Sequence, residues 1–382
     1  MIGVIADDLT GAAELGAVGL RHGLRAEVVL AGEPSRDANL VCLDTDSRSC
    51  APGEAAERAA RAARSLRKHR SDWVYKKTDS VLRGNVTPEL EAIVTALGLD
   101  GALLVPANPS LGRTIVGGQY FVRGQLLHET EFARDPKHPR TSPNVRELIA
   151  APAILPLFVR RADEGLSARG MVIGEASSSD DLRRWAALRN DRWLMAGGAD
   201  FFGALLKLPV SNTKPEYRPD KELFVCGSAS DVTRTFVACQ AEQDVPVFSL
   251  PQELASGSEF GPTSLHQLAE QVIAAFKARP RVVLHIGLPL VTDAAVAETL
   301  ARHLVRVAEA VLHRAPVGHV SAEGGATAVA LARQMGWRRL RVIAELAPGV
   351  VTLSPQDGSS ILFTMKPGTY TWPASLLRLA PH

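Results

Sequence analysis

Short apolar segments alternate with longer segments rich in alanine and leucine along most of this chain. The short segments are often β-branched, as buried strands are, and the longer ones have apolar residues at helical spacing. This alternation favours an α/β fold with mostly parallel sheets flanked by helices. In the first half we predict strands at Ile2–Ile5, Ala26–Leu30, Leu40–Leu43, Trp73–Tyr75 and Ala102–Val105, and helices at Ala12–His22, Pro52–His69 and Thr87–Leu97.

Two stretches interrupt this rhythm. Residues from Gly112 to about Pro156 are rich in Gly, Pro, Arg and His and predict a long excursion from the first domain. The segment 209–221 (PVSNTKPEYRPDK) carries three prolines and predicts a linker. Because 382 residues exceed one average domain, we expect an N-terminal domain over 1–208 and a C-terminal domain over 222–382.

The second half repeats the alternating pattern after the predicted linker. We predict strands at Leu223–Cys226, Val245–Ser249, Val282–His285 and His319–Ser321, helices at Ser230–Glu242, Ser264–Ala278, Ala294–Ala315 and Ala326–Met335, and further apolar segments at Leu340–Ala344 and Ser360–Met365.

Composition and charge exclude several classes of protein. Forty-three basic residues balance 41 acidic ones, which disfavours a nucleic-acid partner. No apolar run is long enough to span a bilayer, and no leader pattern opens the sequence, so a cytoplasmic protein without a membrane partner is expected. The four cysteines form no C-x-x-C pair, which disfavours a zinc site. A homo-oligomer is compatible with the sequence, but nothing in it fixes the oligomeric state.

Four polar clusters follow predicted strands in the first half. Ligands of parallel sheets bind at the carboxyl ends of the strands, so these clusters are candidates for a site. If the strands are neighbours, the clusters converge on one cleft. In chain order they are Asp7, Asp8, Thr10 and Gly11; Asp44, Asp46, Ser47 and Arg48; the run 76–85; and Asn108, Gly112, Arg113 and Thr114.

The residue types in these clusters suit a small hydroxylated anion. Lysine and arginine beside hydroxyl groups bind carboxylates and phosphate oxygens, and a carboxylate can deprotonate a hydroxyl. Each cluster also has a structural interpretation: Asp8 can cap a helix, and the loop DTDSRS can satisfy its own amides. The coincidence of four clusters at strand ends favours a binding site.

The second half has glycine-containing turns instead. CGSAS (226–230) and EGGATA (323–328) each follow a predicted strand and open a helix, whose first amides can hold phosphate. The turns PGV (348–350) and KPGTY (366–370) complete the set. The sequence contains no P-loop pattern, and glycine turns are often purely structural, so nucleotide binding and a structural role both stay open at this point.

These motifs together resemble those of the four-carbon acid sugar kinases, ATP-dependent enzymes that act on threonate, erythronate and related tetronates. The resemblance covers nearly the whole chain, and KKTDSVLRGN (76–85) is its most specific part, whereas GGATA (324–328) alone would be weak. The other matching motifs are IADDLTGA (5–12), DSR (46–48), PANPSLGRT with its continuation GGQYFVRG (106–124), ETEFARDPKHP (129–139), GSAS (227–230), PGV (348–350) and KPG (366–368).

The resemblance implies an ATP-dependent kinase that phosphorylates a hydroxyl, expected to be terminal, of a four-carbon sugar acid in carbohydrate-acid catabolism. It further implies a substrate domain, then a nucleotide domain, with the active site in the cleft between them. The implied acid-sugar contacts are Asp8, Arg48, Lys77, Thr78, Asp79 and Ser80, and the implied nucleotide contacts are Ser228, Gly324, Gly325, Ala326, Thr327 and Gly368.

Phosphoryl transfer depends mainly on positioning and on charge stabilisation. We expect Lys77 and Arg48 to hold the substrate carboxylate or the transferring phosphoryl group. Asp79 and Asp8 are both candidates to orient or deprotonate the attacking hydroxyl, and the sequence does not choose between them. Mg²⁺ is expected to arrive with ATP, held mainly by phosphates and water, and no residue is assigned to the metal.

The nucleotide half departs from the family pattern. The family usually has an acidic residue where this chain has Ala326, often has Ser or Thr where it has Glu323, and has a different phrase in place of KPGTYTWP. Two other classes therefore stay open, a non-catalytic sensor of nucleotide and sugar acid and a phosphate-binding lyase or isomerase. ATP consumption that depends on a tetronate separates the kinase from both.

Overall fold

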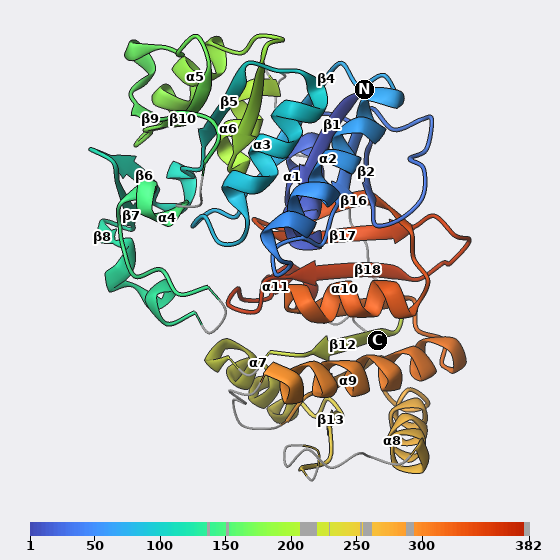
Figure 1. The fold of residues 1–382 in the computed structure, drawn as a ribbon. Helices are drawn as coiled ribbons and strands as arrows, with labels where there is room; N and C mark the ends of the chain where they lie inside the picture. The colour runs from blue at the N-terminus through green and yellow to red at the C-terminus, as the bar shows by residue number, and fades with distance from the viewer. Residues whose placement is uncertain are drawn as a thin grey trace. The chain divides into compact units, whose positions relative to one another are not determined.

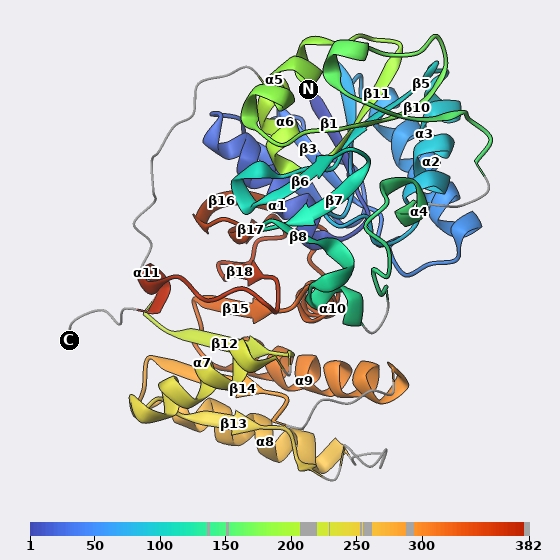
Figure 2. The ribbon, with the colours of Figure 1, turned by 90° about the vertical axis from the view of Figure 1, so that its left-hand side faces the viewer.

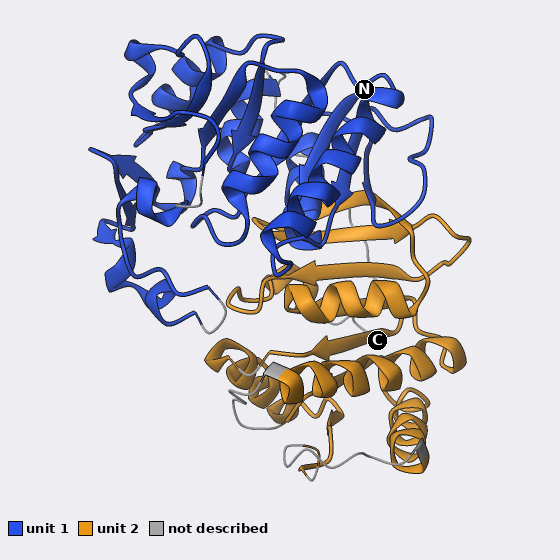
Figure 3. Ribbon diagram, in the orientation of Figure 1, with its two compact units in different colours: residues 1–212 blue, residues 213–382 orange. Residues whose placement is uncertain are grey.

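The computed structural model describes residues 1–135, 138–149, 153–206, 220–228, 230–252, 254, 262–287 and 294–377. The chain divides into two compact units, residues 1–212 and 213–382 (Figure 3). The predicted linker lies outside the described residues except for Asp220 and Lys221. Within the described ranges, no helix is both long enough and apolar enough to cross a membrane.

Unit 1 is built on a parallel sheet with the strand order β2-β3-β1-β4-β11-β5-β10-β9. The five strands predicted in this half, β1 to β5, are confirmed to within two residues at each end. The sequence pattern did not predict β9 to β11, because periodicity cannot separate a short apolar run from a buried helical segment. The strands are β1 Ile2–Ala6, β2 Ala26–Val29, β3 Leu40–Asp44, β4 Trp73–Lys77, β5 Gly101–Val105, β9 Leu157–Arg160, β10 Gly170–Gly174 and β11 Trp193–Gly197.

Helices cover both faces of this sheet (Figure 2). One face carries α2 (Pro52–Lys68) and α3 (Val86–Leu97), which pack against each other. The other carries α1 (Leu9–Arg21), α5 (Ser179–Ala187) and α6 (Ala199–Leu206). Because both faces are buried, the strands read as continuous apolar runs rather than as alternating ones, as parallel sheets do.

The predicted excursion is a small antiparallel sheet with flanking short helices (Figure 2). Its elements are η1 Pro109–Leu111, β6 Arg113–Val116, β7 Gln119–Val122, β8 Gln125–Leu126, η2 Leu127–Glu129, η3 Glu131–Arg134 and α4 Val145–Leu148, and η4 (Ala162–Glu164) follows β9. It folds back on the segment after β4: the hydroxyl of buried Tyr120 donates to the Ser80 carbonyl, and Arg140 Nη1 donates to the Leu82 carbonyl at 2.9 Å.

Unit 2 has the strand order β13-β14-β12-β15-β18-β17-β16, parallel as far as β18 and antiparallel from there. In both units the α/β class with mostly parallel sheets is confirmed (Figure 1). The elements are β12 Glu222–Cys226, α7 Asp231–Glu242, β13 Val247–Ser249, α8 Pro262–Ala275, β14 Arg281–His285, α9 Ala294–Arg314, β15 His319–Glu323, α10 Gly325–Gln334, β16 Arg339–Ala347, β17 Val350–Pro355, β18 Leu362–Lys366 and α11 Ala374–Leu377.

The backbones of β5 and β10 approach each other closely at Gly101, so a larger side chain there should destabilise unit 1. A Cβ added at Gly101 would lie 2.0 Å from the Gly170 carbonyl oxygen, so the two strands would have to separate. We expect Gly101→Ala to cost about 3 kcal/mol or more, which lowers the melting temperature by roughly 6–12 °C in a domain of this size. Differential scanning calorimetry measures this change.

Gly53→Ala is the matched control, since nothing lies within 4 Å of a Cβ there and the residue is in the exposed first turn of α2. This variant should keep or raise the melting temperature, because alanine favours a helix. Equal effects of the two substitutions would contradict the close-packing explanation.

Candidate functional site

Asp8 lies at the junction between β1 and α1. Its backbone is extended (φ −147°, ψ 161°) and its Oδ1 accepts a hydrogen bond from the Gly11 amide at 2.7 Å, so it is the N-cap of α1. The structural interpretation of this residue is confirmed, and the helix begins at Leu9 rather than at the predicted Ala12. Only one oxygen serves as the cap, however. The other, Oδ2, lies 2.6 Å from Nη1 of Arg48.

Arg48 connects three carboxylates that follow β1 and β4. Its Nε and Nη2 donate to the two oxygens of Asp7 at 2.7 and 3.0 Å, and its Nη1 lies 3.8 Å from Asp79. The side chains of Asp7 and Asp79 are 3% and 6% exposed, whereas that of Asp8 is 24% exposed. Of the three carboxylates, Asp8 is therefore the one most accessible to a ligand.

The loops after β3 and β4, which bring these groups together, each hold a non-glycine residue in the left-handed region. These are Asp46 (φ 46°) and Leu82 (φ 62°). Such a conformation costs of order 1–3 kcal/mol and persists only where the surroundings impose it. Asn85 is one such constraint, since its Nδ2 donates to the carbonyls of Ser47 and Cys50 at 3.1 and 2.9 Å.

A buried ion pair supports the loop that carries Arg48. Lys76 Nζ lies 2.9 Å from Glu89 Oε2, and the two side chains are 0% and 2% exposed. The other oxygen of Glu89 accepts a hydrogen bond from the Ser47 hydroxyl, and the Ser47 amide donates to the Asp7 carbonyl at 3.0 Å. Moving either partner away would leave a buried charge uncompensated, which is costly. The pair therefore holds the loop that carries Arg48 in one position.

Lys77, the last residue of β4, contacts the first turns of α1. Its Nζ lies 3.0 Å from Glu14 Oε2 and donates to the Thr78 carbonyl at 2.9 Å. Burial alone would lower the pKa of Lys77, but the carboxylates of Glu14, Asp79 and Asp8 together outweigh burial and raise it. Gly11 makes the contact possible, because a Cβ there would lie 3.2 Å from Lys77 Cγ and 2.9 Å from Asp8 Oδ1.

Asp79 is held on all sides. Both of its oxygens pair with Arg83, from Nε at 3.0 Å and from Nη2 at 2.7 Å, and the amides of Val81 and Arg83 donate to it at 3.1 Å. Burial opposes ionisation, but Arg83 and Arg48 outweigh it and hold the pKa of Asp79 well below its ordinary value. A carboxylate held in this way accepts a proton poorly.

Asp8 has the opposite electrostatic character. Burial raises its pKa, and Arg48 does not offset the combined effect of burial and of the neighbouring Asp7 charge. The pKa of Asp7 is lowered instead, because Arg48 and Lys76 together outweigh its burial. Two adjacent carboxylates with pKa values shifted in opposite directions are typical of a site with distinct chemical roles.

The side chains of the fourth predicted cluster have different partners, although the backbones of Asn108 and Arg113 pair with each other. Asn108 Oδ1 accepts a hydrogen bond from the Asp200 amide at 3.0 Å, which ties it to α6. Arg113 instead donates to the Ser80 hydroxyl, and its guanidinium lies 5.6 Å from the centre of the Phe132 ring. Arg113 therefore joins the segment 77–80, and Asn108 does not.

Three turns of unit 2 meet at the ends of β12, β15 and β18. A Cβ on Gly368 would lie 3.0 Å from Ser228 Oγ and 4.0 Å from Gly324 Cα. A Cβ on Gly227 would lie 1.9 Å from Thr327 Oγ1. Four of the residues predicted to bind nucleotide therefore lie close together, and the chain approaches itself here too closely for larger side chains.

The two glycines of the GGATA turn differ in their roles. Gly324 is the N-cap of α10 and has φ 93°, a conformation that favours glycine, whereas Gly325 is the first helical residue and is not among the glycines with positive φ. Ala326 is exposed and Thr327 is buried. The first backbone N–H groups of α10 lie at this turn, and they have no carbonyl acceptor within the helix.

Glu323, one of the departures from the family pattern, is a structural residue. It is fully buried, its Oε2 lies 3.0 Å from Lys366 Nζ, and it accepts a hydrogen bond from the Thr233 hydroxyl. Lys366 Nζ also lies 4.9 Å from the centre of the Trp372 ring. The pair joins the ends of β15 and β18, and so fixes the two turns that follow them.

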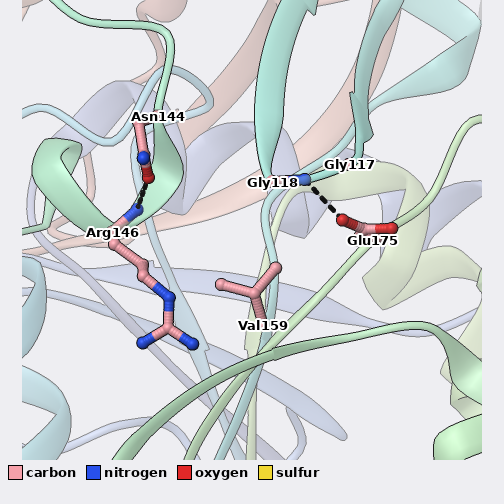
Figure 4. Close-up of a pocket in the computed structure, with 6 residues that line it drawn as sticks. All are labelled: Gly117, Gly118, Asn144, Arg146, Val159 and Glu175. Carbon is pink, nitrogen blue, oxygen red and sulfur yellow. Dashed lines mark hydrogen bonds between the residues drawn. The ribbon is translucent and has the colours of Figure 1, made fainter.

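A pocket of about 310 Å³ lies elsewhere on unit 1 (Figure 4). In it the Gly118 amide donates to Glu175 at 2.5 Å, and the Arg146 amide donates to Asn144 Oδ1 at 3.0 Å, so its polar groups stabilise local backbone. None of its lining residues is a predicted site residue. They are Gly117, Gly118, Asn144, Arg146, Val159 and Glu175.

Comparison with known proteins gives the family. Residues 2–205 match the model of a sugar-binding N-terminal domain, and residues 223–370 match that of a nucleotide-binding C-terminal domain. A D-threonate kinase of Salmonella typhimurium is 30% identical over 381 residues, which cover 90% of this chain and 89% of that kinase. The chain belongs to the four-carbon acid sugar kinase family. The resemblance found in the motifs is thereby confirmed.

Other members of the four-carbon acid sugar kinase family are similarly related. A 3-oxo-tetronate kinase of Pseudomonas fluorescens is 29% identical over 97% of this chain and 94% of its own. A D-erythronate kinase of Heliobacterium modesticaldum is 28% identical over 90% and 88%. A solved protein from Salmonella typhimurium LT2 has the same fold, with a TM-score of 0.81 at 21% identity over 98% of both chains.

Proposed function

We propose that this protein transfers the γ-phosphoryl group of ATP to a hydroxyl, expected to be terminal, of a four-carbon sugar acid such as threonate, erythronate or 3-oxo-tetronate. The observation that carries the proposal is the group of carboxylates around Arg48, with Lys77 beside it at the end of β4. Family membership supports the reaction class.

Asp8 is the proton acceptor for the attacking hydroxyl in this proposal. Its pKa is raised, its side chain is the most exposed of the three carboxylates, and one of its oxygens is not used by the helix cap. Asp79, bound on both oxygens by Arg83, orients the segment 77–80 rather than taking the proton. Of the two candidates from the sequence, the geometry supports Asp8.

Two further proposed substrate contacts, Lys77 and Thr78, each have a polar group available to the substrate. A lysine ammonium has three donors, and Lys77 uses two of them on Glu14 and on the Thr78 carbonyl, which leaves one for an oxygen of the substrate or of the phosphoryl group. The Thr78 hydroxyl is buried and has no hydrogen-bond partner among the described residues, so it is a donor or acceptor ready for a substrate hydroxyl. Arg48 keeps Asp7 and Asp8 in position.

Nucleotide binding is assigned to Ser228, Gly324, Gly325, Ala326, Thr327 and Gly368. The first amides of α10 are suited to phosphate oxygens, because they carry unused donors at the positive end of the helix dipole. Among the described residues, no group of three or more His, Cys, Asp or Glu side chains is arranged to hold a metal ion. We therefore assign no residue to Mg²⁺ and expect it to be carried by the ATP phosphates.

The proposal is tested by ATP consumption in the presence of a panel of four-carbon sugar acids. Consumption should require the acid and be stoichiometric with a phosphorylated product. ATP and acid binding without turnover would instead indicate the sensor, and conversion of a phosphorylated acid without ATP would indicate the lyase or isomerase. A cytoplasmic location remains a prediction from the sequence, and a homo-oligomer is compatible with the sequence without being predicted by it.

The raised pKa of Asp8 also predicts the pH dependence of activity. Only the ionised carboxylate accepts a proton, so activity is full above the pKa of Asp8 and falls as the pH falls through it. Since that pKa is above the ordinary 3.8, the acid limb of kcat/KM should be centred above this value. The profile is measured where calorimetry shows the protein folded, and an acid limb at or below 3.8 would contradict the assignment.

A further inference from the structure

The basic side chains around the acid-sugar site differ in how their charge is compensated. Lys76 pairs with Glu89 and Lys77 with Glu14. Arg48 contacts three carboxylates, and Arg83 contacts two, those of Asp79 and Asp135. Carboxylates of the protein compensate the charges of these four cations, although Lys77 keeps one donor for an oxygen of the substrate or of the phosphoryl group.

Arg140 has no carboxylate partner among the described residues, but its donors are used by the backbone. Its Nη1 donates to the carbonyls of Leu82 and Leu148 at 2.9 and 3.3 Å, and its Nε donates to that of His138 at 3.1 Å. Burial lowers its pKa. Arg140 therefore fastens the excursion to the segment after β4 and is a poor candidate for binding substrate.

Arg113 is the exception. Within the described ranges it has no carboxylate partner, and of its five N–H donors only one, on Nη1, has a partner, the Ser80 hydroxyl. Its guanidinium lies 5.6 Å from the centre of the Phe132 ring. It is half-buried, and it begins β6 directly after the turn at Gly112 (φ 67°).

We propose that Arg113 is the residue that binds the carboxylate of the sugar acid and so makes the enzyme select an acid over a neutral polyol. This inference rests on the proposed function. A guanidinium presents paired donors that match the two oxygens of a carboxylate. It binds a ligand carboxylate most strongly where no protein carboxylate competes for those donors. The Ser80 hydroxyl beside it supplies a further donor, and the excursion that carries Arg113 becomes part of the substrate site.

This assignment explains why the excursion is folded against the segment after β4. The Tyr120 hydroxyl and Arg113 both contact Ser80, one through its carbonyl and one through its side chain. The centre of the Phe132 ring lies 5.6 Å from the guanidinium of Arg113 and 6.0 Å from that of Arg83. Of these two cations, Arg83 is paired with Asp79 and Asp135, whereas Arg113 has no carboxylate partner among the described residues.

The test compares Arg113→Gln with Arg134→Gln, a matched loss of charge at an exposed residue of the same excursion. Binding of the best four-carbon acid from the panel and of its neutral alditol, threitol or erythritol, is measured by calorimetry for each variant, together with kcat and both Michaelis constants. Arg113→Gln should raise the Kd and KM for the acid about 10- to 100-fold, the range for losing a charged hydrogen bond. The alditol Kd and the KM for ATP should change less than about twofold, and Arg134→Gln should behave as wild type.

Several outcomes would overturn the assignment. They are an acid Kd within about twofold of wild type, an equal loss for acid and alditol, a rise confined to the KM for ATP, and a wild-type protein that binds no four-carbon acid. If Arg113→Gln is unfolded by its melting temperature, Arg113→Lys replaces it, because it keeps the charge but loses the paired donors and should give a smaller rise of the same kind. Selective loss of acid binding in a protein without ATP turnover would refute the kinase proposal and still support Arg113.

Discussion

Asp8→Asn is expected to lower kcat by about 10²- to 10⁴-fold with the fold intact, the range for loss of a positioned proton acceptor. Asparagine caps a helix as well as aspartate does, so the hydrogen bond from the Gly11 amide to the side chain at position 8 should be kept. The substitution therefore removes the charge, the proton affinity and the ion pair with Arg48, but keeps the helix cap. Steady-state kinetics and calorimetry on the same preparation measure both.

Asp8→Ala is the informative partner of this variant, because it removes the cap as well. It should be equally inactive and less stable by about 1 kcal/mol. If Asp8→Asn keeps kcat within about tenfold of wild type at an unchanged melting temperature, Asp8 is not the proton acceptor. Asp79 would then be the remaining candidate from the sequence, despite its pairing with Arg83.

Gly325→Ala is expected to raise the KM for ATP at least about tenfold, or roughly 1.4 kcal/mol of binding. Gly325 is the first residue of α10, where the chain should approach the phosphates, and a Cβ would obstruct that approach. The KM for the sugar acid should change much less, since its proposed contacts are all in unit 1. Alanine is a better helix former than glycine, so the melting temperature should not fall.

The structure makes Gly325 a cleaner test than its neighbour. Gly324 has φ 93°, and alanine there would strain the backbone whether or not ATP binds. A lower melting temperature for Gly325→Ala with both Michaelis constants unchanged would indicate a purely structural glycine. A rise confined to the constant for the sugar acid would show that the two halves of the chain are assigned the wrong way round.

Local sequence was sufficient for much of the framework. The alternation of strands and helices predicts β1 to β5, and the aspartate before an amphipathic segment predicts the cap at Asp8, because both depend on residues close together in the chain. The motif 76–85 and the glycine turns of unit 2 locate the candidate site residues. The resemblance gives the family, since those motifs recur in a fixed order.

The ion-pair partners could not be predicted in the same way. Nothing in the local sequence distinguishes Glu14 from other residues of α1, or Glu89 from other residues of α3. In the structure Glu14 pairs with Lys77 and Glu89 pairs with Lys76. Which acid faces which base depends on helix docking against the sheet, and no local pattern records it. A weak signal existed for Glu14, which is three residues after Gly11 and so on the same face of the helix.

The order of residue types along the chain was sufficient to predict the alternating architecture, the positions of the polar clusters and the family. The distribution of charge among these clusters required the folded structure, because a pKa depends on burial and on neighbours that are distant in the chain. Asp8 and Asp79 are the same residue type and both follow a strand, yet Arg83 pairs only with Asp79. The pKa of Asp79 is therefore lowered, whereas that of Asp8 is raised. In the same way Asn108 and Arg113 belong to one motif, but folding directs Asn108 to α6 and leaves Arg113 beside Ser80 without an acidic partner among the described residues.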